Sequence, residues 1–294
     1  MKVLFIYNPH SGKQIIDHKD KYLNFIHETK HDCVFFETKP QYGGYDFLLE
    51  TKETFDVIVG IGGDGTISKI VDAMIQKDLD AKFLVVPAGS TNEYSQTLGV
   101  DFTKIEESLS LLDHGHVKEV DVGMMNGEHF IYVAAFGNFT AASYETPQKW
   151  KNIIGHFAYW IYGVVKLHTI KNYHYKVTIN GTTHDETYLF GLISNATQFG
   201  RVFKYQDDAV SLDDGLFEVL FIRKPESVKD YIQLLQSLLL NQYEGELFLK
   251  EKANHILLES KYREYNWNLD GEDGGRHEKI EVKVLKKKLK VLVP

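Results

Sequence analysis

The stretch "VIVGIGGDGT", residues 57–66, decides how the first part of the chain folds. A run of strand-forming apolar residues leads directly into closely spaced glycines. The next residues, from Ile67 to Lys77, then carry apolar side chains at helical spacing. Strand, glycine turn and helix in this order are typical of a βαβ unit, in which phosphate groups bind at the start of the helix.

The same stretch contains Gly60-x-Gly62-x-x-Gly65, the spacing of a dinucleotide-binding turn. In NAD-binding domains this turn follows the first strand, and an acidic residue ends the next one. Here it follows the third apolar run, and Asp78 and Asp80 precede the next run. Asp64 would repel a phosphate unless a metal ion or water lay between them. The turn therefore favours phosphate together with Mg²⁺ over NAD.

The pattern of apolar runs predicts two domains. Runs at 2–8, 33–38, 56–61 and 82–87 are separated by helix-length segments, which indicates a parallel sheet covered by helices. Later runs are closer together and indicate a mainly antiparallel β-sandwich: 129–136, 173–181, 186–194, 216–223, 253–260 and 278–285. We predict an α/β domain over 1–122 and a β-rich domain over 123–294, whose last run, 289–294, could return to the first domain.

Two further loops follow strands of the predicted parallel sheet. "NPHSGK" (8–13) follows the first run and "PAGSTNEY" (87–94) follows the fourth. The first differs from a P-loop, since Tyr7 replaces the initial glycine and Gln14 replaces the final Ser or Thr. Parallel strands end at one edge of a sheet, so we expect these loops to join the 62–66 turn there and to bind phosphate, with Lys13 as a point charge.

Composition narrows the class of protein. The 294 residues are 43% hydrophobic and carry a formal net charge of −8, which disfavours nucleic acid as a partner. The single cysteine, Cys33, fits a reducing compartment, and the first residues do not form a signal peptide. We therefore expect a folded protein of the cytoplasm.

The three loops together resemble the diacylglycerol kinase catalytic-domain family, whose bacterial members are soluble lipid kinases. "NPHSGK", "GGDGT" and "PAGSTNEY" match the family's N-P-x-S-G-K, nucleotide signature and P-x-G-T-x-N-D-F. "VDVG" (120–123), "DDGLFEV" (213–219) and "LDGE" (269–272) follow in family order, and 146–164 is similar to the bacterial branch. Ser90 and Glu93 replace the usual Thr and Asp, and Gln96 stands where the family often has Arg.

The resemblance implies an ATP-dependent lipid kinase that transfers the γ-phosphate to the hydroxyl of diacylglycerol or a related lipid, giving phosphatidic acid. It implies that the α/β domain holds the nucleotide, with Thr38, the 62–68 loop and Ser90 near adenine and ribose. The expected ATP-binding residues are Asn8, Ser11, Gly12, Lys13, Thr38, Gly62, Gly63, Asp64, Gly65, Thr66, Ser68, Gly89, Ser90 and Asn92.

Four acidic residues are candidates for the chemistry. Asp64 and Asp121 could hold Mg²⁺ through water, and Asp270 and Glu272 are candidate bases. The resemblance assigns Glu272 as proton acceptor and Asp270 to the Mg²⁺ and water network. Asp-Gly within "LDGE" is equally typical of a type I′ hairpin turn.

The resemblance also implies a structural Mg²⁺ site, and the residues themselves suggest where lipid could bind. The Mg²⁺ site consists of Asp214 with the carbonyl groups of Ser211 and Leu216. Residues 153–167 place Ile153, Phe157, Trp160, Val164 and Leu167 on one helical stripe, as in a core helix or an interfacial helix. The lysine run 286–290 could touch lipid headgroups or form a solvated strand edge.

We therefore expect a lipid substrate presented at a membrane surface, transient contact with the inner face of that membrane, and no nucleic acid; a homodimer is left open. Two other functions fit the same loops: an NAD kinase-like phosphotransferase, which shares GGDG, and a module that binds nucleotide or lipid without turnover.

Overall fold

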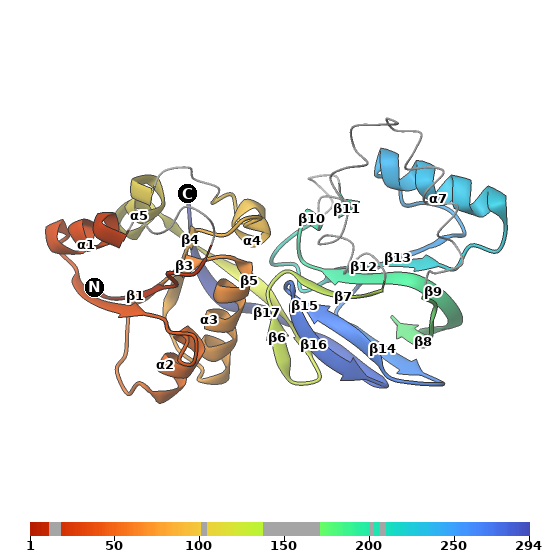
Figure 1. Cartoon of the computed structure of the whole chain (residues 1–294), viewed down its shortest axis with the longest axis horizontal. Coiled ribbons are helices and arrows are strands. Elements are labelled where there is room, and N and C mark those ends of the chain that lie inside the picture. The colour runs from red at the N-terminus through yellow and green to blue at the C-terminus, as the bar shows by residue number, and fades with distance from the viewer. Residues whose placement is uncertain (12–18, 101–104, 138–170, 200–202, 206–209) are drawn as a thin grey trace. The chain divides into compact units, whose positions relative to one another are not determined.

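The computed structural model describes residues 1–11, 19–100, 105–137, 171–199, 203–205 and 210–294 (Figure 1). The chain forms two compact units. Unit 1 comprises Met1–Tyr132, Ser211–Gly215 and Val284–Pro294, and unit 2 comprises Val133–Val210 and Leu216–Lys283. The first unit thus runs ten residues beyond the boundary predicted at 122 and includes the end of the chain.

Unit 1 is built on a parallel sheet. Its strands are β1 (Lys2–Tyr7), β2 (Asp32–Glu37), β3 (Val57–Gly62) and β4 (Lys82–Pro87), in the order β4-β3-β1-β2. The last part of β17 (Lys279–Val293) pairs in parallel with β4, where Val291 lies opposite Phe83. The side chains of β3 are buried on both faces, which explains its continuous apolar sequence.

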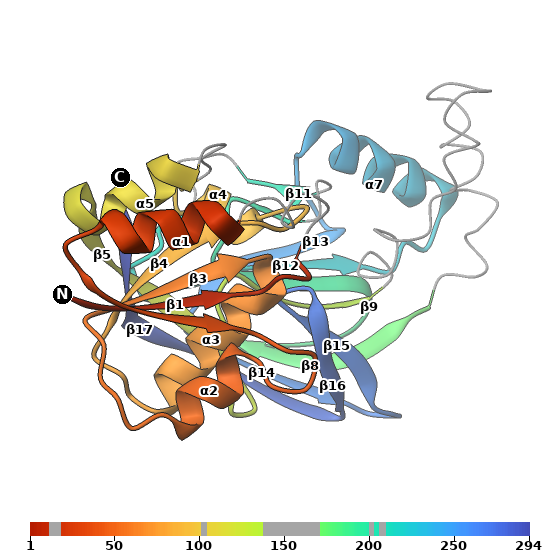
Figure 2. The same ribbon diagram turned by 60° about the vertical axis from the view of Figure 1, so that its left-hand side comes forward.

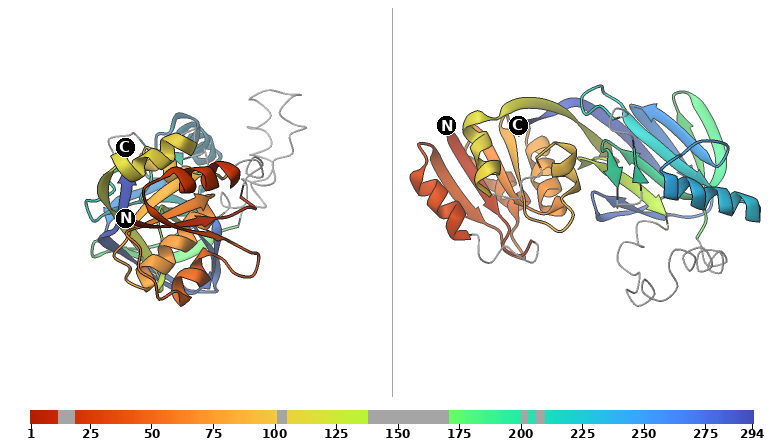
Figure 3. Two further views of the ribbon diagram at one scale, coloured as in Figure 1. Left: turned by 90° about the vertical axis from the view of Figure 1, so that its left-hand side faces the viewer. Right: turned by 90° about the horizontal axis from the view of Figure 1, so that it is seen from above.

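Helices cover both faces of this sheet (Figures 2 and 3). α1 (Lys19–Glu28) and α5 (Ile105–His114) lie on one face, and α2 (Gly44–Glu50) and α3 (Asp64–Gln76) lie on the other. α3 buries Ile67, Ile70, Val71 and Met74, which confirms the helix expected from their spacing. The short helix α4 (Glu93–Thr97) follows β4, and β5 (His116–Met125) pairs with β17 and with β6 (Glu128–Phe130).

Unit 2 is mainly antiparallel. Its principal strands are β7 (Val133–Gly137), β8 (Tyr173–Ile179), β9 (Thr182–Ser194), β12 (Phe217–Arg223), β13 (Phe248–Ala253), β14 (His255–Ser260), β15 (Tyr265–Leu269) and β16 (Glu272–His277). They run in the order β16-β15-β7-β9-β8-β14, and β12 pairs with β9 and β13. Phe136 stands at the centre of an aromatic core and contacts Tyr175, Phe221 and Trp267. The predicted fold class is confirmed.

Two features differ from the sequence-based expectation. The runs at 278–285 and 289–294 belong to one strand, β17, in which Lys287 has a positive φ of 53°. An unexpected helix, α7 (Val228–Leu240), lies on the opposite side of unit 2 from the β15–β16 hairpin (Figures 1 and 2). Gly12, Lys13 and the aromatic stripe of 153–167 lie outside the described residues.

Candidate functional site

The loops after β1 and β3 are joined by side-chain hydrogen bonds. The amide of Asn8 donates to the Thr66 hydroxyl over 2.8 Å, and the Ser11 hydroxyl lies 3.4 Å from the same oxygen. The backbone N–H of Asn8 donates to the carbonyl of Ile61 at the end of β3. Thr38 comes directly after β2, is buried, and donates its N–H to the carbonyl of Tyr7. These residues therefore share the carboxyl edge of the sheet.

The loops after β3 and β4 touch through their backbones. A Cβ built on Gly89 would lie 2.5 Å from the Cα of Gly63, so at this contact a side chain would displace the neighbouring backbone. Ala88 donates its N–H to the carbonyl of Gly62 over 2.9 Å. The amide of Asn92 brackets Gly89, accepting from its N–H at 2.8 Å and donating to its carbonyl at 3.1 Å. All three predicted loops thus form one connected edge.

Asp64 links the second loop to the third. One carboxylate oxygen accepts from the Thr91 hydroxyl at 3.0 Å and from the N–H of Glu93 at 3.2 Å, and the other accepts from the N–H of Tyr94 at 3.2 Å. Glu93 and Tyr94 begin α4, so Asp64 satisfies donors that a helix start leaves unpaired. The pattern of the sequence did not reveal this capping role or the contribution of Thr91. That Asp64 also holds Mg²⁺ through water stays a prediction.

The start of α3 offers the chemistry of an anion site. Gly63 occupies the N-cap position and provides no side-chain acceptor to the first turn of this 13-residue helix. Backbone N–H groups at a helix start point beyond it, and the helix dipole adds partial positive charge there. A Cβ on Gly62 would lie 2.6 Å from the Cβ of Thr66, so any side chain at position 62 would collide with Thr66 in the first turn of the helix. The described loop residues therefore fit a chain of phosphate groups.

Gln96, found where a cation was expected from the resemblance, has a structural partner. Its side-chain amide donates to the carbonyl of Thr91 over 2.8 Å. It thereby holds the turn that contacts Asp64. Ser90 is exposed in the same loop, and Gly65 and Ser68 are half-buried in α3.

Asp121 is a buried clamp within unit 1. Its two carboxylate oxygens accept from the N–H of Gly215 at 2.6 Å and from the N–H of Lys287 at 2.7 Å. Its own N–H donates to the carbonyl of Leu212 at 2.7 Å. Gly215 and Lys287 both have positive φ, so the carboxylate fixes two unusual backbone conformations. Asp121 therefore ties β5, the 211–215 segment and β17 together.

The predicted structural Mg²⁺ site falls beside this clamp. Asp214 is half-buried, and the hydroxyl of Ser211 donates to Asp213 over 3.1 Å. Leu216 is the first residue after the segment that belongs to unit 1. Across the described ranges, no group of three or more His, Cys, Asp or Glu side chains gathers to hold a metal ion. The predicted Mg²⁺ site consists of one carboxylate and two carbonyl groups, so the absence of such a cluster neither supports nor contradicts it, and the site stays a prediction.

The "LDGE" motif forms a tight turn between β15 and β16. Leu269 pairs with Glu272, and the two residues between them, Asp270 and Gly271, have φ values of 51° and 90°, as in a type I′ turn. Asp270 is buried and exchanges two 2.9 Å hydrogen bonds with the backbone of Val133. Glu272 is exposed. The two candidate bases therefore differ: Asp270 is built into unit 2, whereas Glu272 is accessible to a proton donor.

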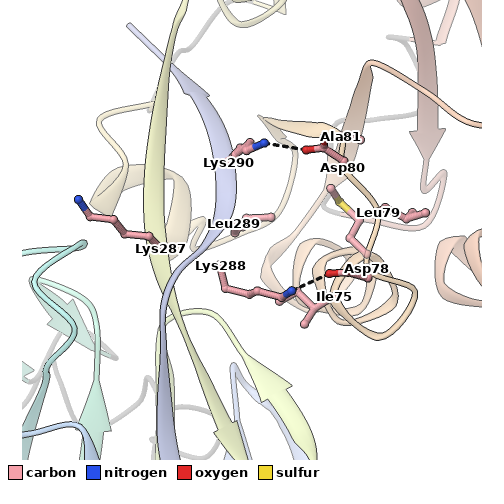
Figure 4. A pocket seen from close by; sticks show the side chains of 10 residues that line it. Ile75, Asp78, Leu79, Asp80, Ala81, Lys287, Lys288, Leu289 and Lys290 are labelled. Carbon is pink, nitrogen blue, oxygen red and sulfur yellow. Dashed lines mark hydrogen bonds and ion pairs between the residues drawn. The ribbon is translucent and has the colours of Figure 1, made fainter.

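The lysine run of β17 is partly neutralised. Lys288 and Lys290 form ion pairs of 2.7 and 2.6 Å with Asp78 and Asp80 (Figure 4). Hydrogen bonding to Lys290 lowers the pKa of Asp80. The pairs border a cavity of about 310 Å³ whose wall includes Leu289 and the end of α3. It lies where β4 begins, at the opposite end of that strand from the phosphate loops.

Comparison with known proteins places this geometry in a family. Residues 2–125 match the model of the diacylglycerol kinase catalytic domain. Over 284 residues the chain is 31% identical to the diacylglycerol kinase of Staphylococcus aureus strain JH9, and the match covers 92% of this chain and 86% of that protein. The chain belongs to the diacylglycerol kinase family. The diacylglycerol kinase of S. aureus strain Newman matches with the same identity and coverage.

Solved structures share the fold of this diacylglycerol kinase family member. A diacylglycerol kinase from Bacillus anthracis str. Sterne superposes with a TM-score of 0.72 at 21% identity, covering 100% of this chain and 97% of that one. A second structure from the same organism gives 0.77 at the same identity and coverage. Since the family consists of kinases, we assign the chain to the phosphotransferases. Among the described residues, no helix is both long and apolar enough to cross a membrane.

Proposed function

We propose that this protein transfers the γ-phosphate of ATP to the hydroxyl of diacylglycerol or a related lipid and thereby forms phosphatidic acid. The observation that carries the proposal is that three loops meet at one edge of the sheet. There the backbones of Gly63 and Gly89 are in contact at the N-terminus of α3, which has no side-chain cap. Such an edge supplies donors to phosphate oxygens without bulky side chains. Family membership provides the lipid acceptor as the class of substrate.

The residues of unit 1 have separate roles in this proposal. The N–H groups at the start of α3, with Asn8, Ser11 and Thr66, hold the phosphates, and Thr38 with Ser90 lies toward the nucleoside. Gly12 and Lys13, which lie outside the described residues, would also bind the phosphates. When bound, Mg²⁺ neutralises charge on the phosphate oxygens. Asp64 would hold it through water, while Asp214 with the carbonyl groups of Ser211 and Leu216 would hold a structural ion. Asp121 was also expected to hold Mg²⁺ through water, but it is buried and both of its carboxylate oxygens accept backbone N–H groups, so we propose that it positions the 211–215 segment instead.

Glu272 is the proposed base. As the lipid oxygen attacks the γ-phosphorus, its proton passes to the Glu272 carboxylate, the bond from phosphorus to the β-bridging oxygen breaks, and ADP leaves. An exposed carboxylate suits this role because a lipid hydroxyl can reach it. Asp270 positions the turn through its bonds to Val133. We propose that the reaction takes place in the cytoplasm, at the inner face of the membrane.

Transfer of labelled phosphate from ATP tests the function. Purified protein with Mg²⁺ is offered diacylglycerol, related hydroxylated lipids and NAD, and we expect label on diacylglycerol. Glu272→Gln should abolish transfer, whereas Asp273→Asn, a neighbouring exposed carboxylate on the same strand, should retain it. Label on NAD alone would establish the NAD kinase-like alternative. Binding of ATP without transfer to any acceptor would establish a non-catalytic module.

A further inference from the structure

Helix α7 exposes several large hydrophobic side chains and buries only one residue. Val228 is 68% exposed, Ile232 41%, Leu239 61% and Leu240 64%. Four of the nine large hydrophobic side chains that are exposed in the described residues therefore lie on this one helix. Leu234 is its only buried residue. Exposed hydrophobic residues that are scattered singly are ordinary, but these four are concentrated on one helix of 13 residues.

Three of the exposed side chains form a continuous stripe with the half-buried Leu235. Val228, Ile232, Leu235 and Leu239 follow each other at intervals of four, three and four residues, the spacing of one helical face. Lys229 and Gln233 lie beside the stripe and are exposed. We call Val228, Ile232, Leu235 and Leu239 the α7 stripe. It is amphipathic in the manner of a helix that lies in the plane of a membrane surface.

The helix that carries the stripe has well-formed ends. Ser227 accepts from the N–H of Asp230 at 3.2 Å, and the Asp230 carboxylate accepts from the N–H of Ser227 at 2.9 Å and of Glu226 at 3.0 Å. Asn241 ends the helix with a positive φ of 52°. Asp230 is the one acidic residue of α7, and its carboxylate is directed to the cap. The α7 stripe is therefore presented on a defined helix and carries no charge.

The dimensions of the stripe argue against a second copy of this chain as its occupant. A helix of 13 residues is about 20 Å long and about 10 Å wide, so the stripe covers roughly 200 Å². A stable protein interface buries about 800 Å² on each partner. A bilayer sets no such minimum, because apolar side chains gain by burial one at a time at the headgroup boundary.

Charge narrows the kind of bilayer contact. The formal net charge of −8 gives no general attraction to anionic lipid, and Lys288 and Lys290 are engaged with Asp78 and Asp80. Neither the net charge nor these two lysines therefore provides a strong electrostatic attraction to a bilayer. Apolar burial remains as the driving force, and it does not weaken with salt as attraction between surface charges does.

We propose that the α7 stripe is the surface by which this protein docks on the lipid bilayer that contains its substrate. The side chains of Val228, Ile232 and Leu239 enter the boundary between headgroups and acyl chains, and Leu240 extends the contact at the end of the helix. The proposal rests on the proposed function for the identity of the membrane-held substrate. It assigns docking to a helix distinct from the phosphate-binding loops.

Binding to vesicles tests the proposal without relying on catalysis. Wild-type protein should co-sediment with phosphatidylcholine vesicles that contain a minor fraction of diacylglycerol, and the bound fraction should be the same in low and high salt. Ile232→Glu combined with Leu239→Glu should lower the partition coefficient at least about tenfold, because charge opposes insertion. Leu49→Glu combined with Val117→Glu adds the same charge at two exposed hydrophobic residues outside α7 and should bind like wild type.

Kinase assays separate docking from chemistry. On diacylglycerol in vesicles the stripe variant should lose activity about as much as it loses binding, whereas on a short-chain diacylglycerol dissolved in water it should match wild type. Circular dichroism checks the fold, and Ile232→Ser with Leu239→Ser provides a milder variant if the first unfolds. Equal vesicle binding by wild type and a folded stripe variant would overturn the proposal, as would a wild-type dimer that the variant converts to a monomer. Intact vesicle binding with no transfer to either substrate would contradict the proposed function alone.

Discussion

Replacing Gly89 with alanine tests whether the contact between the second and third loops sets the phosphate site. The backbone of Gly89 lies outside the left-handed region, so alanine can adopt its conformation and the effect is steric. The new Cβ would lie 2.5 Å from the Cα of Gly63 and 2.8 Å from Oδ1 of Asn92. Ordinary contacts begin near 3.4 Å, so the two loops must part by about 1 Å.

A displacement of this size should be visible in both stability and activity. Overpacking of this kind costs about 1–3 kcal/mol of unfolding free energy. Misplacement of reacting groups by about 1 Å costs roughly a hundredfold in rate. We therefore expect kcat/KM for ATP to fall by about two orders of magnitude, measured with diacylglycerol held at a fixed concentration.

The control is Gly43→Ala, the same change at a glycine whose added Cβ would meet its nearest atom at 3.6 Å. It should leave kcat/KM for ATP unchanged and alter the melting temperature only slightly. If Gly89→Ala keeps the wild-type kcat/KM for ATP and the wild-type melting temperature, the approach of Gly89 to Gly63 does not shape the phosphate site, and the reasoning is refuted.

Three other predictions follow from the carboxylates and the buried tyrosines. Asp121→Asn should lower the free energy of unfolding by about 3 kcal/mol, because an amide cannot accept both backbone N–H groups; urea denaturation checks this, and a loss below about 1 kcal/mol would contradict the clamp. Glu272→Ala should reduce kcat by a factor of at least about 10² at unchanged melting temperature. Asp270→Ala should instead lower the free energy of unfolding by about 2 kcal/mol, because it leaves the N–H of Val133 unpaired. If Asp270→Ala lost activity and Glu272→Ala lost stability, the two roles would be exchanged. Burial raises the pKa of four tyrosines well above the value of about 10 that they have in the unfolded chain, so their contribution to stability is complete below pH 10 and declines above it. The absorbance of tyrosinate from these residues should therefore appear together with unfolding as the pH is raised. Its appearance while the fold is intact would show that their hydroxyls are accessible and would contradict the prediction. The four are Tyr22, Tyr175, Tyr188 and Tyr205.

Most of unit 1 follows from local sequence rules. Apolar runs of strand length fixed the parallel strands, and the spacing of Ile67, Ile70 and Met74 fixed α3, because periodicity and burial are coupled in a helix. The three loops could be predicted to lie together, since parallel strands end at one edge of the sheet. Helix α7 was not predicted, although Ser227 and Asp230 form a capping box and Val228, Ile232 and Leu235 stand at helical spacing.

The sequence by itself determined which residue types are available to bind phosphate, in which loops they stand, and that an Asp-Gly pair would turn the chain at 270–271. The tertiary structure alone decided how the acidic residues are used. Asp64 caps α4, Asp121 clamps Gly215 and Lys287, and Asp270 holds Val133, all across long separations in the chain. The sequence does not show whether a carboxylate faces solvent or accepts a backbone N–H group. Its partners are set by where other segments fold, and that placement depends on the packing of the whole unit.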